Sequence, residues 1–111
     1  ERTCNTAEGE MVDSNHVAVF GNEFECAETG LEKGDKVLVE FDFDKVELTD
    51  NPEDGTAEAQ INFILYKGNH YHITLKTKDG EKIYVNTNDV WEDYDDVGIN
   101  IKASDLRITK Q

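Results

Sequence analysis

The chain has 111 residues, of which 32% are charged and 37% hydrophobic, and its formal net charge at pH 7 is −14. This length suggests one domain, or two small halves that share a core. The longest apolar stretches have the length of a strand, far below the roughly 20 residues of a transmembrane helix. A surface this acidic repels phosphate and anionic lipid headgroups, which disfavours direct binding to nucleic acid or to a membrane surface.

The chain contains two cysteines, Cys4 and Cys26, too few for the dense disulfide framework of a small secreted domain. We expect both to be reduced thiols in a cytosolic protein, with a single disulfide as the alternative. The chain begins at Glu1 rather than methionine, so we expect a processed chain or a segment cut from a longer protein.

Alternating apolar and polar residues, the pattern of half-buried strands, recur along the chain. They predict strands at 16–20, 37–41, 56–67, 71–75, 83–85 and 97–101. The long segment 56–67 is expected to bend or bulge midway. Turn-forming residues separate the strands at 21–22, 32–35, 51–55, 67–69 and 78–80. Several short strands at this spacing, without a long helical period, predict an all-β barrel or sandwich.

The chain also contains an internal repeat. Residues 37–48 (VLVEFDFDKVEL) match residues 97–108 (VGINIKASDLRI), each reading as a strand, a short turn with an aspartate and an apolar–polar–apolar stub. Upstream, residues 20–24 align with residues 66–71, with one inserted residue. The repeat predicts a lead-in at 1–8 and one domain at 9–110. Its halves, 9–50 and 56–110, are joined by an acidic link at 49–55 and share one core.

Two histidines, His70 and His72, stand two apart in the strand-like stretch LYKGNHYHITLKTKDG, residues 65–80. On a strand this spacing puts both imidazoles on one face, within reach of one metal ion. A metal site needs a third rigid ligand, and the remaining histidine, His16, lies in the other half. The alignment of the halves places both histidines on the outer, solvated face of the strand. We therefore interpret them as surface residues that could line a dimer contact, with assembly sensitive to pH near about 6.5.

The inner face of the same strand is predicted to carry Tyr71, Ile73 and Leu75.

The loop NDVWEDYDD, residues 88–96, gathers carboxylates around two aromatic rings. Its candidate ligand residues are Asp89, Trp91, Glu92, Asp93 and Tyr94. Carboxylates beside aromatic faces suit an organic polycation such as a polyamine, through ion pairs and cation–π contact. Calcium is an alternative, although the spacing does not match an EF-hand loop. The simplest alternative is a solvated acidic loop in which Trp91 caps the barrel and Tyr94 packs on its rim.

No catalytic constellation emerges from the sequence. Glu40, Asp42 and Asp44 share one face of an alternating strand, which is typical of a solvated sheet face, while Phe43 belongs to the opposite, apolar face. Cys26 has no basic neighbour to lower its pKa, and we interpret it as a small core residue. The phosphate-binding motif G-x-x-x-x-G-K-[ST] does not occur in these 111 residues. We therefore expect no enzymatic activity and no cofactor or metal in the chain itself.

Residues 9–48 followed by 57–108 resemble the C-terminal regulatory region of the ATP-binding subunits of ABC importers, the region that contains the TOBE module. The likeness is strongest to the spermidine/putrescine branch. It is carried by YKGNHY at 66–71, DG at 79–80 and ASDLRI at 103–108, in that order and spacing, and it covers nearly the whole chain. The family usually has an Arg-Pro-Glu-Asp type turn after the strand of the first half, where this chain has FDFD at 41–44.

The resemblance implies a small OB-like β-barrel on the cytosolic side of the membrane, a non-catalytic regulatory and dimerisation domain. The parent subunit would be an ATPase that uses ATP and Mg to drive polyamine uptake, peripheral on the inner face of the cell membrane. Its partners would be its own nucleotide-binding domain, a second copy of the subunit and the membrane permease subunits, without nucleic acid and without direct membrane insertion. The alternative function is a free-standing β-barrel that senses a small cation or oxyanion.

Overall fold

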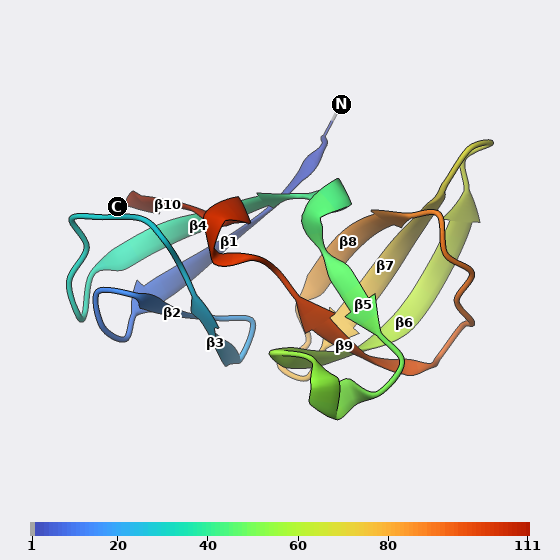
Figure 1. Cartoon of the computed structure of the whole chain (residues 1–111), viewed down its shortest axis with the longest axis horizontal. Helices are drawn as coiled ribbons and strands as arrows, with labels where there is room; N and C mark the ends of the chain where they lie inside the picture. The colour runs from blue at the N-terminus through green and yellow to red at the C-terminus, as the bar shows by residue number, and fades with distance from the viewer. Residues whose placement is uncertain (1) are drawn as a thin grey trace.

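The computed structural model describes residues 2–111, and these residues form ten strands and three short 3₁₀ turns (Figure 1). Sheet A has the strand order β10-β4-β1-β2-β3, and sheet B has the order β5-β9-β6-β7-β8. All recorded strand pairs are antiparallel. The predicted all-β fold is therefore confirmed.

The strands of sheet A are β1 (Cys4–Met11), β2 (His16–Val19), β3 (Asn22–Glu25), β4 (Lys36–Asp42) and β10 (Arg107–Lys110). The strands of sheet B are β5 (Glu47–Thr49), β6 (Ala57–Tyr66), β7 (Tyr71–Thr77), β8 (Lys82–Thr87) and β9 (Asp96–Asn100). The 3₁₀ turns are η1 (Phe43–Lys45), η2 (Pro52–Asp54) and η3 (Ala103–Asp105).

The two sheets lie side by side as two lobes, and their strand orders correspond one to one (Figure 1). Replacing β10, β4, β1, β2 and β3 by β5, β9, β6, β7 and β8 converts the order of sheet A into that of sheet B. The repeat found in the sequence corresponds to β4-η1-β5 in one half and β9-η3-β10 in the other. The chain is therefore built from two related halves, as predicted.

Each half completes its sheet with a strand from the other half. β5 follows β4 along the chain but pairs with β9, with Leu48 opposite Ile99. β10 follows β9 but pairs with β4, with Ile108 opposite Val39. The sheets therefore do not coincide with the halves drawn from the repeat, because sheet A takes residues 107–110 and sheet B takes residues 47–49. A three- or four-residue stub carries no signal for the sheet that it joins.

The first strand begins earlier than the sequence indicated. β1 occupies most of the segment expected as a lead-in, and it pairs with β4 from Cys4 opposite Asp42 to Glu10 opposite Lys36. Its sequence, CNTAEGEM, contains one β-branched residue, so it lacks the composition that marks a strand. β1 is held in the sheet because it pairs with β2 on one side and with β4 on the other.

The upstream alignment of the two halves is wrong in register. The turn at Gly21 joins β2 to β3, and the turn at Gly80 joins β7 to β8, so Gly21 corresponds to Gly80 rather than to Gly68. Gly68 lies in the preceding turn, between β6 and β7. The backbone angle φ is positive at all three glycines: 75° at Gly21, 86° at Gly80 and 95° at Gly68. Each of these turns therefore favours a glycine, and the sequence alone does not show which turns correspond.

The core follows the alternation of the strands. Ile73 and Leu75 of β7 are fully buried, as predicted, and Tyr71 is half-buried. The register of β6 shifts between Ile61 and Phe63, which confirms the predicted irregularity in this long strand. The largest fully buried side chains are Phe24, Phe41, Met11, Ile61, Ile73, Leu75, Ile83 and Ile99. No helix within residues 2–111 combines the length and apolar character needed to span a membrane.

Candidate functional site: a pocket on the outer face of sheet B

The face of sheet B that points away from the core carries two rows of neighbouring side chains. One row contains Leu65, His72 and Asn86, and the next contains Phe63, Thr74 and Tyr84. On β7 and β8 they alternate with the buried Ile73, Leu75, Ile83 and Val85, and on β6 they flank the partly buried Ile64, so alternation directs these six side chains outward.

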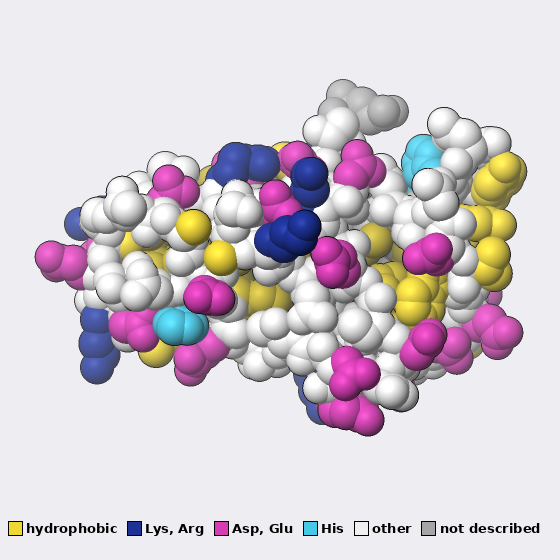
Figure 2. Space-filling model, in the orientation of Figure 1, with side chains coloured by type: hydrophobic (Ala, Val, Ile, Leu, Met, Phe, Trp, Pro, Cys, Tyr) yellow, Lys and Arg dark blue, Asp and Glu magenta, His cyan; other side chains and the backbone are white. Residues whose placement is uncertain are grey.

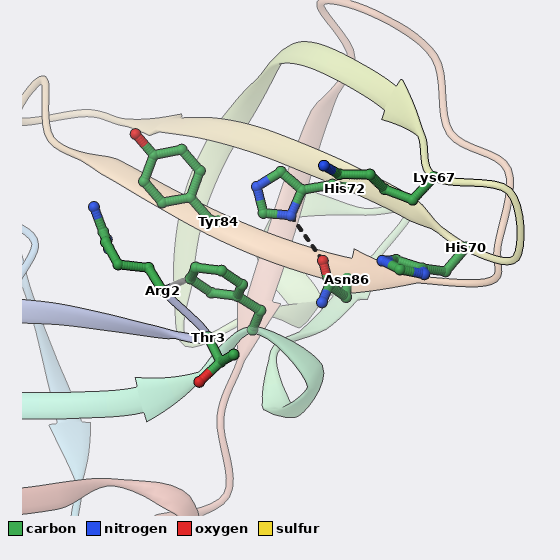
Figure 3. A pocket seen from close by; sticks show the side chains of 8 residues that line it. Arg2, Thr3, Lys67, His70, His72, Tyr84 and Asn86 are labelled. Atoms are coloured by element: carbon green, nitrogen blue, oxygen red, sulfur yellow. Dashed lines mark hydrogen bonds between the residues drawn. The ribbon is translucent and has the colours of Figure 1, made fainter.

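A pocket of about 530 Å³ opens on this face (Figure 3). Four parts of the chain meet there: the N-terminal segment, η1, the turn between β6 and β7, and the strands β7 and β8. We call it the outer pocket, and its lining residues are Arg2, Thr3, Phe43, Lys67, His70, His72, Tyr84 and Asn86.

Aromatic rings form the floor of the outer pocket. The rings of His72 and Tyr84 lie parallel, with centroids 5.7 Å apart and an angle of 6° between their planes. Phe43 packs against both, at 5.2 Å from His72 and 5.9 Å from Tyr84. The guanidinium carbon of Arg2 lies 5.3 Å from the centre of the Tyr84 ring, which is cation–π geometry.

The observed position of Phe43 corrects two predictions about this face. The alternation of the sequence placed Phe43 on the apolar face of an extended strand, but the chain turns into η1 there and carries the ring onto sheet B. His72 is consequently half-buried against Phe43 and Tyr84 rather than solvated. A 3₁₀ turn of three residues leaves no periodic signal in the sequence.

Hydrogen bonds fix both imidazoles of the pocket. His72 Nδ1 lies 2.7 Å from Asn86 Oδ1, and His70 Nδ1 lies 2.6 Å from Asn69 Oδ1. Because an amide oxygen only accepts, each imidazole donates through Nδ1.

The third histidine lies in the other lobe, where His16 Nδ1 contacts Asp13. The three histidines therefore do not converge. No group of three or more His, Cys, Asp or Glu side chains within residues 2–111 is arranged to hold a metal ion.

The acidic loop between β8 and β9 carries the other five predicted ligand residues, and it does not contribute to the lining of the outer pocket. Trp91 packs against the core, and its buried Nε1 has no hydrogen-bond partner in the part of the chain that is described. Tyr94 is 71% exposed with a φ of 69°, so it does not pack on the rim. Asp89, Glu92 and Asp93 are exposed, and their binding of a polycation stays a prediction.

Sequence reasoning missed Arg2, Lys67, Tyr84 and Asn86. Tyr84 and Asn86 alternate with buried Ile83 and Val85, which marks them as outward-facing residues of one strand. The missing information was the register that places them opposite the histidine strand.

The two cysteines are free thiols, Cys4 half-buried and Cys26 buried. Burial raises the pKa of the Cys26 thiol, and the carboxylate of Asp13 adds to the shift. Cys26 belongs to the buried core, as the sequence indicated.

An exposed apolar patch continues from the outer pocket onto the open edge of β6. We call it the β6 patch; it comprises Phe63, Leu65 and Tyr66, which are 58%, 43% and 60% exposed. β9 pairs with β6 only from Ala57 to Gln60, so the rest of this edge beyond Ile61 has no strand partner among residues 2–111. Hydrophobic side chains gather along the sheet B side of the surface in Figure 2.

No protein-family model matches the chain. It is 53% identical over 111 residues to the spermidine/putrescine import ATP-binding protein PotA of Bacteroides thetaiotaomicron and 50% identical to that of Bacteroides fragilis. A PotA protein of Acetivibrio thermocellus is 28% identical over 107 residues. These matches cover 96–99% of the chain, but the chain spans only 24–30% of the length of these relatives.

Among solved structures, the chain resembles the cytoplasmic molybdate-binding protein ModG in a molybdate-bound crystal form. The TM-score is 0.81 at 13% sequence identity, and the match covers 96% of each chain. This likeness confirms the predicted OB-like fold class built from two related halves.

Proposed function

We propose, since the chain is homologous along its whole length to a segment of spermidine/putrescine import ATP-binding proteins, that it is a non-catalytic regulatory and dimerisation module of such a subunit. The observation that carries the proposal is the 53% identity over 111 residues, which span 24% of the relative. This identity also confirms the resemblance drawn from the sequence. The remaining length of such a subunit would hold the ATP and Mg site, because the phosphate-binding motif does not occur in these 111 residues.

The β6 patch supports an assembly role. An open strand edge that also exposes large apolar side chains is a ready surface for pairing, and proteins usually cover or blunt such edges. We assign this surface to a second copy of the subunit, since the subunits of the resembled family act as a pair. The whole subunit would work at the inner face of the cell membrane with permease subunits.

The first experiment uses the full-length subunit and a version that lacks this module. We expect the truncated subunit to bind ATP normally but to dimerise less and to lose the control of its ATPase rate by the transporter. Dimerisation is measured by light scattering, and the ATPase rate is measured with permease in vesicles. Unchanged dimerisation and unchanged control would overturn the proposal, as would a coding sequence upstream of Glu1 without a nucleotide-binding domain.

A second experiment tests the surface. The double variant Phe63→Lys/Leu65→Lys in the full-length subunit is expected to weaken dimerisation by at least about tenfold, because two charges would be buried without partners. Val90→Lys is the matched control, since Val90 is 78% exposed and lies outside the β6 patch. Equal dimerisation of the double variant and the control would show that this surface is not the contact.

A second candidate function, sensing of a small ligand, is favoured by the outer pocket. ModG shares the fold and is a molybdate-binding protein. Calorimetric titration of the chain with spermidine, putrescine and divalent metals tests this candidate, and binding at micromolar strength would support a sensor.

A further inference from the structure

The outer pocket is positively charged in a strongly acidic chain. Its lining includes Arg2, Lys67 and two of the three histidines, but no aspartate or glutamate of residues 2–111. The carboxylate that comes next to it is Asp44, which lines an adjoining hollow shared with His70 and Asn86. The charged groups that a ligand in the pocket can contact directly are therefore positive.

The overall charge of −14 does not cancel this local field. At physiological ionic strength, exposed charges farther away than a Debye length of about 8 Å are largely screened. A ligand seated in the pocket touches Lys67 or Arg2 directly, and contacts of this kind are screened much less.

Several donors in the pocket are free to bind a ligand. Neither Arg2 nor Lys67 forms an ion pair with any of residues 2–111. The side-chain oxygen of Asn86 accepts the hydrogen bond from His72, so the NH₂ group of Asn86 remains available as a donor. Lys67, His70 and Asn86 lie toward one end of the pocket, whereas Arg2 lies at the other end (Figure 3). The end near Lys67 therefore combines an ammonium with an amide donor, which suits an oxyanion.

Between these ends the floor is aromatic. The rings of His72 and Tyr84 are stacked in parallel, so a planar group of a ligand can continue this stack, and the guanidinium of Arg2 lies over the Tyr84 ring. The volume of about 530 Å³ is in the range of sites for organic ligands and exceeds the needs of a lone inorganic anion.

We propose that the outer pocket binds a small phosphorylated molecule with a flat ring, of the nucleoside monophosphate kind. The phosphate lies against Lys67 and the amide of Asn86, and the ring stacks on His72 and Tyr84. This inference rests on the ligand-sensing candidate above and not on the assembly role, so the two can fail separately.

The test is calorimetric titration of the 111-residue chain with AMP, adenosine and inorganic phosphate, together with amide shifts in NMR spectra. We expect AMP to bind with a Kd between about 10 μM and 1 mM and to bind more tightly than either part alone. The shifts are expected at His72, Tyr84 and Asn86. Absence of AMP binding at about 5 mM would overturn the inference, as would shifts confined to the other lobe.

Variants separate the roles of the two parts of the ligand. Lys67→Ala is expected to weaken AMP binding by about tenfold through loss of a charged hydrogen bond. Lys33→Ala, which removes the same charge from an exposed turn of the other lobe, is the control and should change nothing. Tyr84→Leu is expected to weaken the binding of AMP without altering the binding of inorganic phosphate.

If Lys67→Ala and Lys33→Ala weakened AMP binding equally, the binding would reflect general charge attraction and the proposed site would be wrong. Phosphate binding as tight as that of AMP would overturn the flat-ring assignment. Light scattering of the full-length subunit reports separately on the assembly proposal, because the variants Lys67→Ala and Tyr84→Leu lie outside the β6 patch.

Discussion

Asn5 of sheet A pairs with the backbone of Tyr84 in sheet B as a neighbouring strand would. Its Nδ2 donates to the Tyr84 carbonyl oxygen at 2.8 Å, and its Oδ1 accepts from the Tyr84 amide at 2.8 Å. Tyr84 lies in β8, the edge strand of sheet B, and Asn5 is only 2% exposed. One buried side chain therefore joins the two lobes and holds the strand that carries the floor of the outer pocket.

Asn5→Ala is expected to destabilise the protein by about 2–4 kcal/mol, because the amide and the carbonyl of Tyr84 both lose a buried partner. Urea unfolding measured by circular dichroism gives the change in unfolding free energy. Asn22→Ala, at an exposed position of β3, is the control and should stay within about 0.5 kcal/mol of the parent. If the two variants were equally stable, the contact between Asn5 and Tyr84 would contribute nothing.

The exchange of β5 and β10 couples the two lobes. Ile108 of β10 is 7% exposed in the sheet A lobe, although its chain segment leaves directly from β9 of sheet B. We expect Ile108→Ala to cost about 2–4 kcal/mol and to lower the stability of both lobes together. Trp91 fluorescence reports on the sheet B lobe, and the reactivity of the buried Cys26 thiol reports on the sheet A lobe.

The two probes should give one coincident urea transition in the parent and in Ile108→Ala. Two separate transitions, with only the Cys26 probe shifted by the variant, would show that the lobes fold independently.

Gly55 and Gly98 allow η2 to approach β9 closely. A Cβ at Gly98 would lie 2.7 Å from the Gly55 amide nitrogen and would collide with Thr49 Oγ1, and a Cβ at Gly55 would lie 2.6 Å from Gly98 Cα. Gly98→Ala is therefore expected to destabilise the protein by about 1–3 kcal/mol through overpacking. Thermal unfolding measures this effect, and Ser104→Ala, at an exposed site, is the control. An unchanged melting temperature in Gly98→Ala would contradict the close approach.

The strands were largely predictable because alternation is a local property of the sequence. The buried pair Ile73 and Leu75 and the irregular β6 could be inferred in this way. The exchange of β5 and β10 could not, because it depends on which sheet offers the better partner. For the candidate site, the spacing predicted only that His70 and His72 share one face, and the sequence did not indicate that they line a pocket. Arg2 and Phe43 reach the pocket only through tertiary packing.

The turn between β1 and β2 contains an exposed ion pair that should titrate measurably. His16 Nδ1 lies 3.0 Å and 3.1 Å from the two carboxylate oxygens of Asp13, and this hydrogen bond raises the pKa of His16 above its usual value. The backbone amide of Asn15, which donates to Asp13 Oδ1 at 2.8 Å, and the His16 ring lower the pKa of Asp13.

These shifts define when the pair stabilises the turn. A raised histidine pKa contributes stability that is complete below the unfolded value of about 6.5 and is lost as pH rises through the raised value. A lowered aspartate pKa contributes stability above its unfolded value, near about 3.9, that is lost as pH falls through the lowered value. The turn is therefore held best in the window between about pH 4 and pH 6.5.

An NMR titration of the His16 ring tests the pair directly. The midpoint for His16 should fall in Asp13→Asn, because the variant removes the carboxylate that accepts from the imidazolium. Asp50→Asn, which removes an exposed charge from another part of the chain, should leave the midpoint in place. An equal fall in both variants would mean that the net charge of the chain, and not the contact with Asp13, raises the pKa of His16. No fall in Asp13→Asn would show that the ion pair does not form in solution.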